Sequence, residues 1–266
     1  MSGITLISTV RAPEEQVRRF VEHHHNLGID EIMLFYDDPE MAFEYGDTRF
    51  VCDGKYWGIR PSSIEQRQIR NVNYARIFAR GDWLIHLDCD ELIQGPIKTE
   101  DVDVLRFTQL EAVPEKMKYE SIFEPRLFRR NVSQWRRWLA SKFCPNAFYN
   151  GEYFRGYTLP KCIMRKSVGR IGNHGPVDFT GLRVKQSAIP LAHYDCVGFE
   201  DWQRKWEWRL DRSGYATELR DARLQQMQAY YIAKTLGHLE ELYQRLYFIP
   251  ARERRILSVM GMLVRL

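Results

Sequence analysis

Short apolar runs alternate with amphipathic stretches along the first 90 residues, and this pattern predicts an α/β unit. The runs 4–10 and 31–36 are rich in β-branched and aromatic residues and have the length of strands. Between them, apolar residues recur at helical spacing from Pro13 to Leu27, and Gly28 ends the helix. A strand, a helix and a second strand in this order favour a mostly parallel, Rossmann-like sheet that helices flank, with a ligand at the carboxyl ends of the strands.

The pattern changes character near residue 199. Before that point strand candidates are interleaved with helices, whereas the remainder of the chain shows helical spacing. We therefore predict one α/β domain over residues 1–198 and a helical C-terminal extension over residues 199–266 that packs on it. The further strand candidates are 50–53, 82–87, 102–110, 122–130, 161–165 and 188–193. The further helix candidates are 62–79, 135–143, 217–235, 238–247 and the tail to Leu266.

The stretch from Asp82 to Glu91 places three acids in four positions directly after a short apolar run. In an extended backbone Asp88 and Asp90 point to one face, while Cys89 points back into the sheet. Two carboxylates on one face repel each other unless a cation lies between them, and Mg²⁺ or Mn²⁺ with a diphosphate as its other ligand suits such a pair. A solvated acidic turn is the alternative, but the buried run in front of the acids favours the metal site.

Composition and charge describe an ordinary globular protein and exclude some classes. The formal net charge of +4 is mild and the basic residues are scattered among acids, so we expect no nucleic-acid partner. The five cysteines are odd in number and far apart, as in reduced thiols of a cytoplasmic protein. The N-terminus lacks the pattern of a signal peptide, and no apolar run reaches the ~18 residues of a membrane span. We therefore expect a cytoplasmic protein.

Several short motifs occur in an order that is typical of one enzyme family. They are Val10-Arg11, His23-His24-His25-Asn26-Leu27-Gly28-Ile29-Asp30, Phe35-Tyr36-Asp37-Asp38, Trp83-Leu84-Ile85-His86-Leu87-Asp88-Cys89-Asp90-Glu91, and His193-Tyr194 followed by Trp202 and Lys205. This set resembles the glycosyltransferases of the GT-A fold, and within them the family-2-like and family-92-like proteins. The resemblance covers about residues 4–206. It implies that a sugar is transferred from a nucleotide-diphosphate sugar to a glycan or glycan precursor, some of which are lipid-linked, in the synthesis of cell-surface polysaccharide.

The resemblance also implies a metal site around the acidic stretch. Asp88 and Asp90 would bind Mn²⁺ or Mg²⁺, and His193 would be a third protein ligand, since an imidazole beside two carboxylates suits Mn²⁺. Glu91 would hold the two aspartates in position without binding the metal itself. His174, in the sequence Gly172 to Pro176, is a further active-site ligand, an acceptor contact or a turn residue.

On the donor side, the resemblance places Arg11 and Asp37 or Asp38 near the base and ribose, and Lys205 near the diphosphate. Two departures from the family's pattern fall here. Arg11-Ala12-Pro13 stands where Lys-Asn-Glu is frequent, and Pro39-Glu40-Met41 follows Asp38 where Ser-x-Asp is usual. The helix before the acidic strand is unusually polar, so Gln66 and Arg76 are candidates to face the donor pocket, although a solvated helix face is the simpler interpretation.

The acceptor side has weaker signals. Inversion at the sugar is implied by the related families, and it needs a carboxylate base. Glu152, in an aromatic and Gly-rich segment, and Asp178 are the candidates. Trp135 and Trp138 either stack on an acceptor sugar or serve another role.

Two other functions fit parts of the same pattern. A nucleotidyltransferase uses a similar carboxylate pair, but it should carry a Gly-rich basic loop after the first strand, which this chain lacks. A non-catalytic domain would use the helical tail for protein contacts. The segment 252–266 is basic and then apolar, which suits contact with the inner face of a membrane as well as packing on the domain itself. The sequence sets no oligomeric state.

Overall fold

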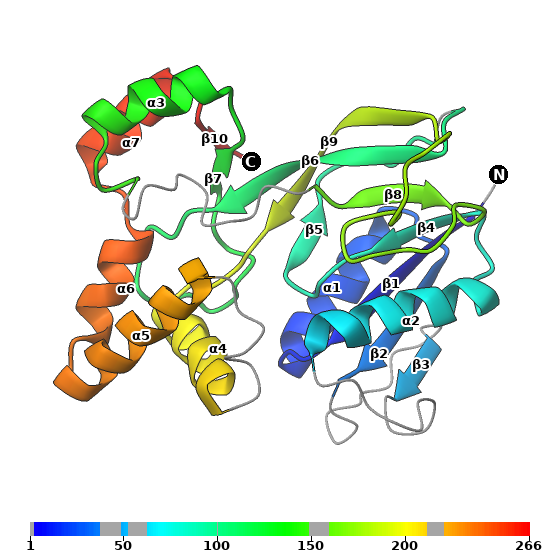
Figure 1. The fold of residues 1–266 in the computed structure, drawn as a ribbon, viewed down its shortest axis with the longest axis horizontal. Helices are drawn as coiled ribbons and strands as arrows, with labels where there is room; N and C mark the ends of the chain where they lie inside the picture. The colour runs from blue at the N-terminus through cyan, green and yellow to red at the C-terminus, as the bar shows by residue number, and fades with distance from the viewer. Residues whose placement is uncertain (1–2, 38–48, 53–62, 100, 149–159, 212–220) are drawn as a thin grey trace. The chain divides into compact units, whose positions relative to one another are not determined.

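The computed structural model describes residues 3–37, 49–52, 63–99, 101–148, 160–211 and 221–266, and the chain forms two compact units (Figure 1). The first unit comprises Met1–Gln109 and Leu159–His193, and the second comprises Leu110–Thr158 and Tyr194–Leu266. The chain thus passes between the units more than once, and the domain boundary after residue 198 stays a prediction.

The first unit contains a parallel half-sheet with the strand order β3-β2-β1-β4. The helices α1 and α2 flank this sheet (Figure 1). The alternation of strand and helix read from the sequence therefore corresponds to the observed elements. Their bounds are β1 Ile4–Val10, α1 Glu14–Asn26, β2 Glu31–Tyr36, β3 Arg49–Cys52, α2 Ile64–Phe78 and β4 Trp83–His86.

Antiparallel strands extend this half-sheet beyond β4. Strand β8 (Cys162–Arg165) pairs with β4, and β6 (Val104–Ala112) pairs with β8. Strand β9 (Val184–His193) pairs with β6 and with β5 (Glu91–Ile93). The predicted α/β class is confirmed, but the sheet is mixed, and its parallel part is β3-β2-β1-β4.

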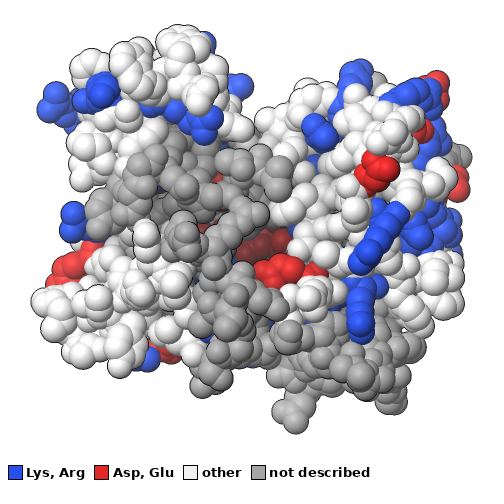
Figure 2. Space-filling view, viewed as in Figure 1, with Lys and Arg blue, Asp and Glu red and all other residues white. Residues whose placement is uncertain are grey.

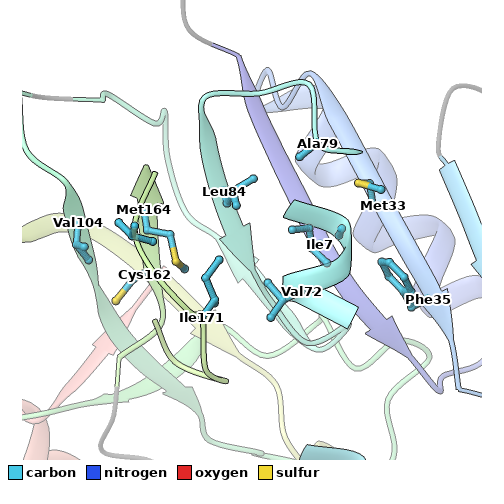
Figure 3. Close-up of a cluster of buried hydrophobic side chains, with 12 residues drawn as sticks. Ile7, Met33, Phe35, Val72, Ala79, Leu84, Val104, Cys162, Met164 and Ile171 are labelled. Atoms are coloured by element: carbon cyan, nitrogen blue, oxygen red, sulfur yellow. The ribbon is translucent and has the colours of Figure 1, made fainter. Parts of the chain in front are cut away.

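A compact apolar core fixes α2 on the sheet. Val72 and Ala75 of α2 are fully buried against Ile7, Met33 and Leu84 from three neighbouring strands, as Figure 3 shows for the labelled side chains. Every residue of β1 is buried, as expected for a central parallel strand with both faces covered. Ser63 caps the start of α2, because its side chain accepts the backbone N–H of Gln66 at 3.2 Å.

The second unit joins a small antiparallel sheet to a set of helices. Strand β7 (Leu127–Arg130) pairs with the end of β6 and with β10 (Leu263–Arg265), so the predicted strand 122–130 is shorter and the tail is not helical throughout. Trp202 and Trp206 are buried with Tyr230 and Tyr243 in an aromatic cluster. The helices are α3 Gln134–Phe143, α4 Phe199–Asp211, α5 Asp221–Leu236, α6 Leu239–Tyr247 and α7 Ala251–Val259.

The segment 252–266 is largely packed into the second unit. Leu257 of α7 and Met262 and Leu263 after it are buried in an apolar cluster, and Arg254 and Arg265 both form ion pairs with Glu115 at 2.9 Å. A membrane contact through this segment stays a prediction: Leu257, Met262 and Leu263 face the protein, whereas Val259 and Leu266 are exposed. Among the described residues, no helix has the length and apolar character needed to cross a bilayer.

A buried histidine in α1 links this helix to β5. The His24 Nδ1–H donates to the carbonyl of Phe20 at 2.8 Å, and the backbone N–H of Ile93 donates to Nε2 at 3.4 Å. Because one nitrogen donates and the other accepts, the folded protein requires a neutral imidazole. Burial, with the charge of His23 beside it, lowers the pKa of His24 to about 3.

We predict that His24 makes the protein less stable as the pH falls. Its folded pKa lies below the unfolded value of about 6.5, so its contribution is present above that value and is lost at up to ~1.4 kcal/mol per pH unit as the pH decreases toward about 3. Urea denaturation of wild type and His24→Gln should show a shallower pH dependence in the variant. His238→Gln, at an exposed site, should keep the wild-type slope. Equal slopes in all three proteins would contradict the assignment.

Candidate active site

The parallel pairing brings the ends of three strands to one edge of the first unit's sheet. The backbone N–H of Asp37, just after β2, donates to the carbonyl of Val10 in β1 at 2.9 Å. The backbone N–H of Leu87, just after β4, donates to the carbonyl of Ile7 at 3.1 Å. The side chains that follow β1, β2 and β4 are therefore neighbours at this carboxyl edge, where open α/β sheets bind their ligands.

The chain turns sharply after β4. The Glu91 N–H donates to the carbonyl of Asp88 at 3.0 Å, and the Glu91 carboxylate accepts the Asp88 N–H at 2.8 Å, which closes the turn from both sides. Cys89 points back into the sheet, where its sulfur lies 3.4 Å from the Ser8 hydroxyl. The expectation that Asp88 and Asp90 share a face of an extended strand is wrong, because β4 ends at His86 and Cys89 and Asp90 lie in the turn.

Asp88 is held by two side chains from other elements. The ammonium of Lys161, just before β8, lies 3.0 Å from one carboxylate oxygen, and the Gln68 amide of α2 donates to the other at 2.6 Å. The same ammonium lies 3.4 Å from the Glu91 carboxylate. The side chain of Lys161 is 2% exposed and that of Glu91 is fully buried, whereas that of Asp88 is 28% exposed. One cation thus compensates two acids at the edge of the sheet.

The charges in this cluster divide the two acids into different protonation states. Burial is the largest single influence on Asp88 and would raise its pKa, but the charge and hydrogen bond of Lys161, together with the nearby His86 and His193, outweigh burial and lower the pKa to about 2. Burial raises the pKa of Glu91 to about 7, and the nearby Asp88 charge adds to this while Lys161 opposes it. Burial opposes the charge of Lys161, yet Asp88 and Glu91 keep its pKa above the ordinary value. Asp88 and Lys161 therefore form the permanent ion pair.

Asp90 contacts a residue about a hundred positions away in the sequence. The antiparallel pairing of β5 with β9 sets Glu91 opposite His193, and the His193 Nε2 lies 3.7 Å from an Asp90 carboxylate oxygen. Both side chains are mostly buried, at 15% exposure for Asp90 and 8% for His193. A carboxylate beside an imidazole is a donor pair suited to Mn²⁺. No cluster of three or more ligand side chains at metal-binding distances occurs within the part of the chain that the structure describes.

Two further histidines are associated with this edge. His86, the last residue of β4, is buried, and the backbone of Asn173 lies close enough to its ring to affect its pKa. Burial, followed by the charge of Lys161, lowers the pKa of His86 to about 3, so it is neutral. His174, the predicted alternative ligand, lies close enough to His86 to contribute to this shift. Its role as a ligand stays a prediction.

Asp37 lies in a buried ion pair at the ends of β1 and β2. Arg67 of α2 donates from Nε and Nη2 to the two carboxylate oxygens at 2.5 and 3.1 Å, and both side chains are almost completely buried. Arg11 adds a third contact, with its Nη1 3.6 Å from the carboxylate. Arg11 and Asp37 are thus neighbours, as their predicted role near the nucleotide requires, but Asp37 already has both oxygens engaged.

Other predicted donor residues lie away from the carboxylates. Gln66 is exposed in the first turn of α2. Arg76, in the last turn of α2 near the start of β4, donates to the carbonyls of Val168, at 2.8 Å, and Gly169. Asp38 is outside the described residues. The polar face of α2 does contribute to the site, but through Gln68.

The remaining predicted residues are in different surroundings. Lys205 belongs to the second unit, where its ammonium lies 3.0 Å from Asp195 and 3.5 Å from Asp201. Asp178 is exposed, and its carboxylate accepts the backbone N–H of Thr180 at 2.8 Å, which lowers its pKa. Glu152 is outside the described residues. The contact that the structure describes for Asp178, with Thr180, does not bring it to the Asp88 and Asp90 turn, and the role of both candidates as bases stays a prediction.

Sequence reasoning missed Lys161, Gln68 and His86. Lys161 offered one signal, since it directly precedes the apolar strand Cys162–Arg165 and a lone lysine at a buried strand end needs an acid nearby. Its partner was not visible, because Asp88 is 73 residues away.

Comparisons with known proteins do not identify this site. No family model matches the chain, and a search of curated proteins finds no matching relative.

We predict that Lys161→Met destabilises the protein by about 3 kcal/mol, because it leaves the buried Glu91 and the adjacent Asp88 without their cation. The loss should shrink as the pH falls, since the carboxyl groups can then take up protons. Urea denaturation should also show partial recovery in the double variant Glu91→Gln/Lys161→Met. Lys98→Met, at an exposed position, should change stability by less than ~0.5 kcal/mol. A Lys161→Met protein as stable as the wild type would refute the compensation.

Proposed function

We propose that the chain is a metal-dependent glycosyltransferase of the GT-A type. It transfers a sugar from a nucleotide-diphosphate sugar to a glycan or glycan-precursor acceptor, with inversion at the anomeric carbon. The observation that carries the proposal is the position of Asp88 and Asp90. Both follow β4, next to the end of β1, and Asp90 lies 3.7 Å from the His193 imidazole at this edge of the sheet.

The ligand set is chemically consistent with a divalent cation. Asp90 and His193 would hold Mn²⁺ or Mg²⁺, and Asp88 can add a third donor because a carboxylate oxygen that accepts one hydrogen bond keeps another lone pair. The bound metal would neutralise charge that develops on the leaving diphosphate. Glu91 holds the turn in shape through the Asp88 backbone N–H. Lys161 keeps Asp88 ionised and therefore able to bind a cation.

We propose that the nucleotide binds at the neighbouring carboxyl ends of β1 and β2. Arg11 is partly exposed beside the buried Asp37–Arg67 pair, so its guanidinium is fixed in direction by Asp37 while its edge stays accessible. A fixed guanidinium can donate to a phosphate, ribose or base oxygen without a large loss of side-chain freedom. Glu152 and Asp178 stay the predicted bases that take the proton from the acceptor hydroxyl.

Transfer should depend strongly on Asp90. With Mn²⁺ and a panel of uridine, guanosine and deoxythymidine diphosphate sugars, the wild type should release nucleoside diphosphate. Asp90→Ala should reduce this rate by about a hundredfold or more, because the metal loses a charged ligand. Asp88→Ala and His193→Ala should also reduce the rate. Asp82→Ala provides the matched control, since Asp82 precedes the same strand at its other end and is exposed. Undiminished release by Asp90→Ala would exclude the proposed mechanism.

Nucleotide binding should itself require metal. In a thermal-shift screen of nucleoside diphosphates and triphosphates, diphosphates should raise the melting temperature of the wild type with Mn²⁺ and not without it, because a ligand that binds only the folded state stabilises it. His193→Ala should lose this metal-dependent shift. Stabilisation by triphosphates alone would favour a nucleotidyltransferase. A flat result for all nucleotides would favour a non-catalytic domain.

A further inference from the structure

Helix α3 in the second unit turns a large apolar face toward solvent. Trp135, Trp138 and Phe143 are 61%, 64% and 58% exposed, and Leu139 between them is 36% exposed. With Lys142 they occupy one side of the helix, since positions three, four and eight apart share a face. We call these five residues the α3 face.

The opposite side of α3 already supplies the packing that the fold needs. Ala140 and the C-cap residue Cys144 are buried in an apolar cluster with Leu257 of α7. A surface helix normally has one apolar stripe toward the core and polar residues outside. In α3 the outward side is apolar as well, and it carries two tryptophans. Packing within the second unit therefore does not explain the α3 face.

The surroundings of the α3 face are positively charged. From residue 129 to residue 143 the sequence has five basic residues and no acid. Two of them lie over the exposed rings: the Arg136 guanidinium is 5.4 Å from the Trp135 ring centre, and the Lys142 ammonium is 5.6 Å from that of Trp138. Figure 2 shows Lys and Arg side chains and no described acidic one on this side of the molecule, where Figure 1 places α3 and α7.

We propose that the α3 face docks on an anionic membrane surface. Indole rings prefer the boundary between hydrocarbon and lipid headgroups, because one part of the ring is apolar and the N–H is polar. Basic residues beside them are attracted to anionic headgroups. In α3 the cation–π contacts hold each cation against a ring, so charge and indole enter the headgroup layer together.

Charge favours this partner over a second copy of the chain. Two α3 faces brought together would place Arg136, Lys142 and the exposed Arg130 of one copy near those of the other, and like charges would oppose the contact. The proposed surface also differs from the segment 252–266, in which Leu257, Met262 and Leu263 are buried. None of the residues in the α3 face belongs to the Asp88 and Asp90 turn or to the proposed nucleotide side of the site. Trp135 and Trp138 are, however, the rings predicted from the sequence as candidate contacts of an acceptor sugar, and membrane docking is the alternative role proposed for them.

Vesicle binding by the full chain tests this proposal. Flotation should recover the wild type with vesicles of phosphatidylcholine and phosphatidylglycerol, and much less with phosphatidylcholine alone or at high salt. The variant Trp135→Gln/Trp138→Gln should lower the partition coefficient about tenfold or more, because two interfacial rings are lost. The variant Arg136→Gln/Lys142→Gln should lower it roughly fivefold per charge on the anionic vesicles only.

Matched substitutions separate the α3 face from general surface apolarity. Tyr231→Gln/Ile232→Gln replaces two side chains of α5 that are 63% and 57% exposed, and it should bind vesicles as the wild type does. Circular dichroism should show native helix content in every variant. Equal vesicle binding by the wild type and the Trp135/Trp138 variant would overturn the proposal. The absence of vesicle binding by the wild type would also overturn it. If light scattering then showed a wild-type dimer that is lost in the Trp135/Trp138 variant, the α3 face would be assigned to a contact between copies.

Discussion

The candidate site depends on the buried ammonium of Lys161. Taking this cation and the Glu91 carboxyl out of water is costly, and only their close contacts with each other and with Asp88 offset that cost. The sheet topology makes these contacts possible. Ile85 of β4 pairs with Ile163 of β8, and the antiparallel register continues so that Lys161 comes level with the residues just beyond β4. The antiparallel pairing of β8 with β4 therefore places Lys161 beside the acidic turn.

This arrangement gives the two aspartates of the turn different roles. Asp88 has a fixed cation and an amide donor, so its charge is largely compensated by the protein. Asp90 faces the imidazole of His193, whose Nε2 lies 3.7 Å from the carboxylate and can serve as a metal ligand. An Asp-x-Asp motif therefore need not act as a symmetric pair. Here the first carboxylate is tied to the protein's own cation and the second is placed beside a potential metal ligand.

The same features explain how far the sequence could predict the structure. Apolar periodicity located β1, α1, β2, α2 and β4, because each has a strong local pattern, and the shared carboxyl edge follows from parallel pairing. It could not show the turn at Cys89 and Asp90, because the three-residue strand β5 begins directly after it and leaves no local signal. Lys161 and Gln68 were missed for a related reason, since their contacts with Asp88 depend on the pairing of β8 and the packing of α2.

The net charge of the chain does not predict where charged residues gather on the surface. The formal value of +4 averages over the whole chain, but electrostatic attraction acts over about 10 Å in salt, so the local arrangement determines what binds. At the turn after β4, Asp88, Asp90 and Glu91 outnumber Lys161, the cation that compensates Asp88 and Glu91. Around α3, cations lie among the exposed rings, whereas Glu253, the acid that contacts the residues just after the helix, is buried. Periodicity predicted that α3 is a helix, yet its apolar residues lie on both sides of the axis. Only the packing of Ala140 and Cys144 shows which side is already used, and hence which side remains for a partner.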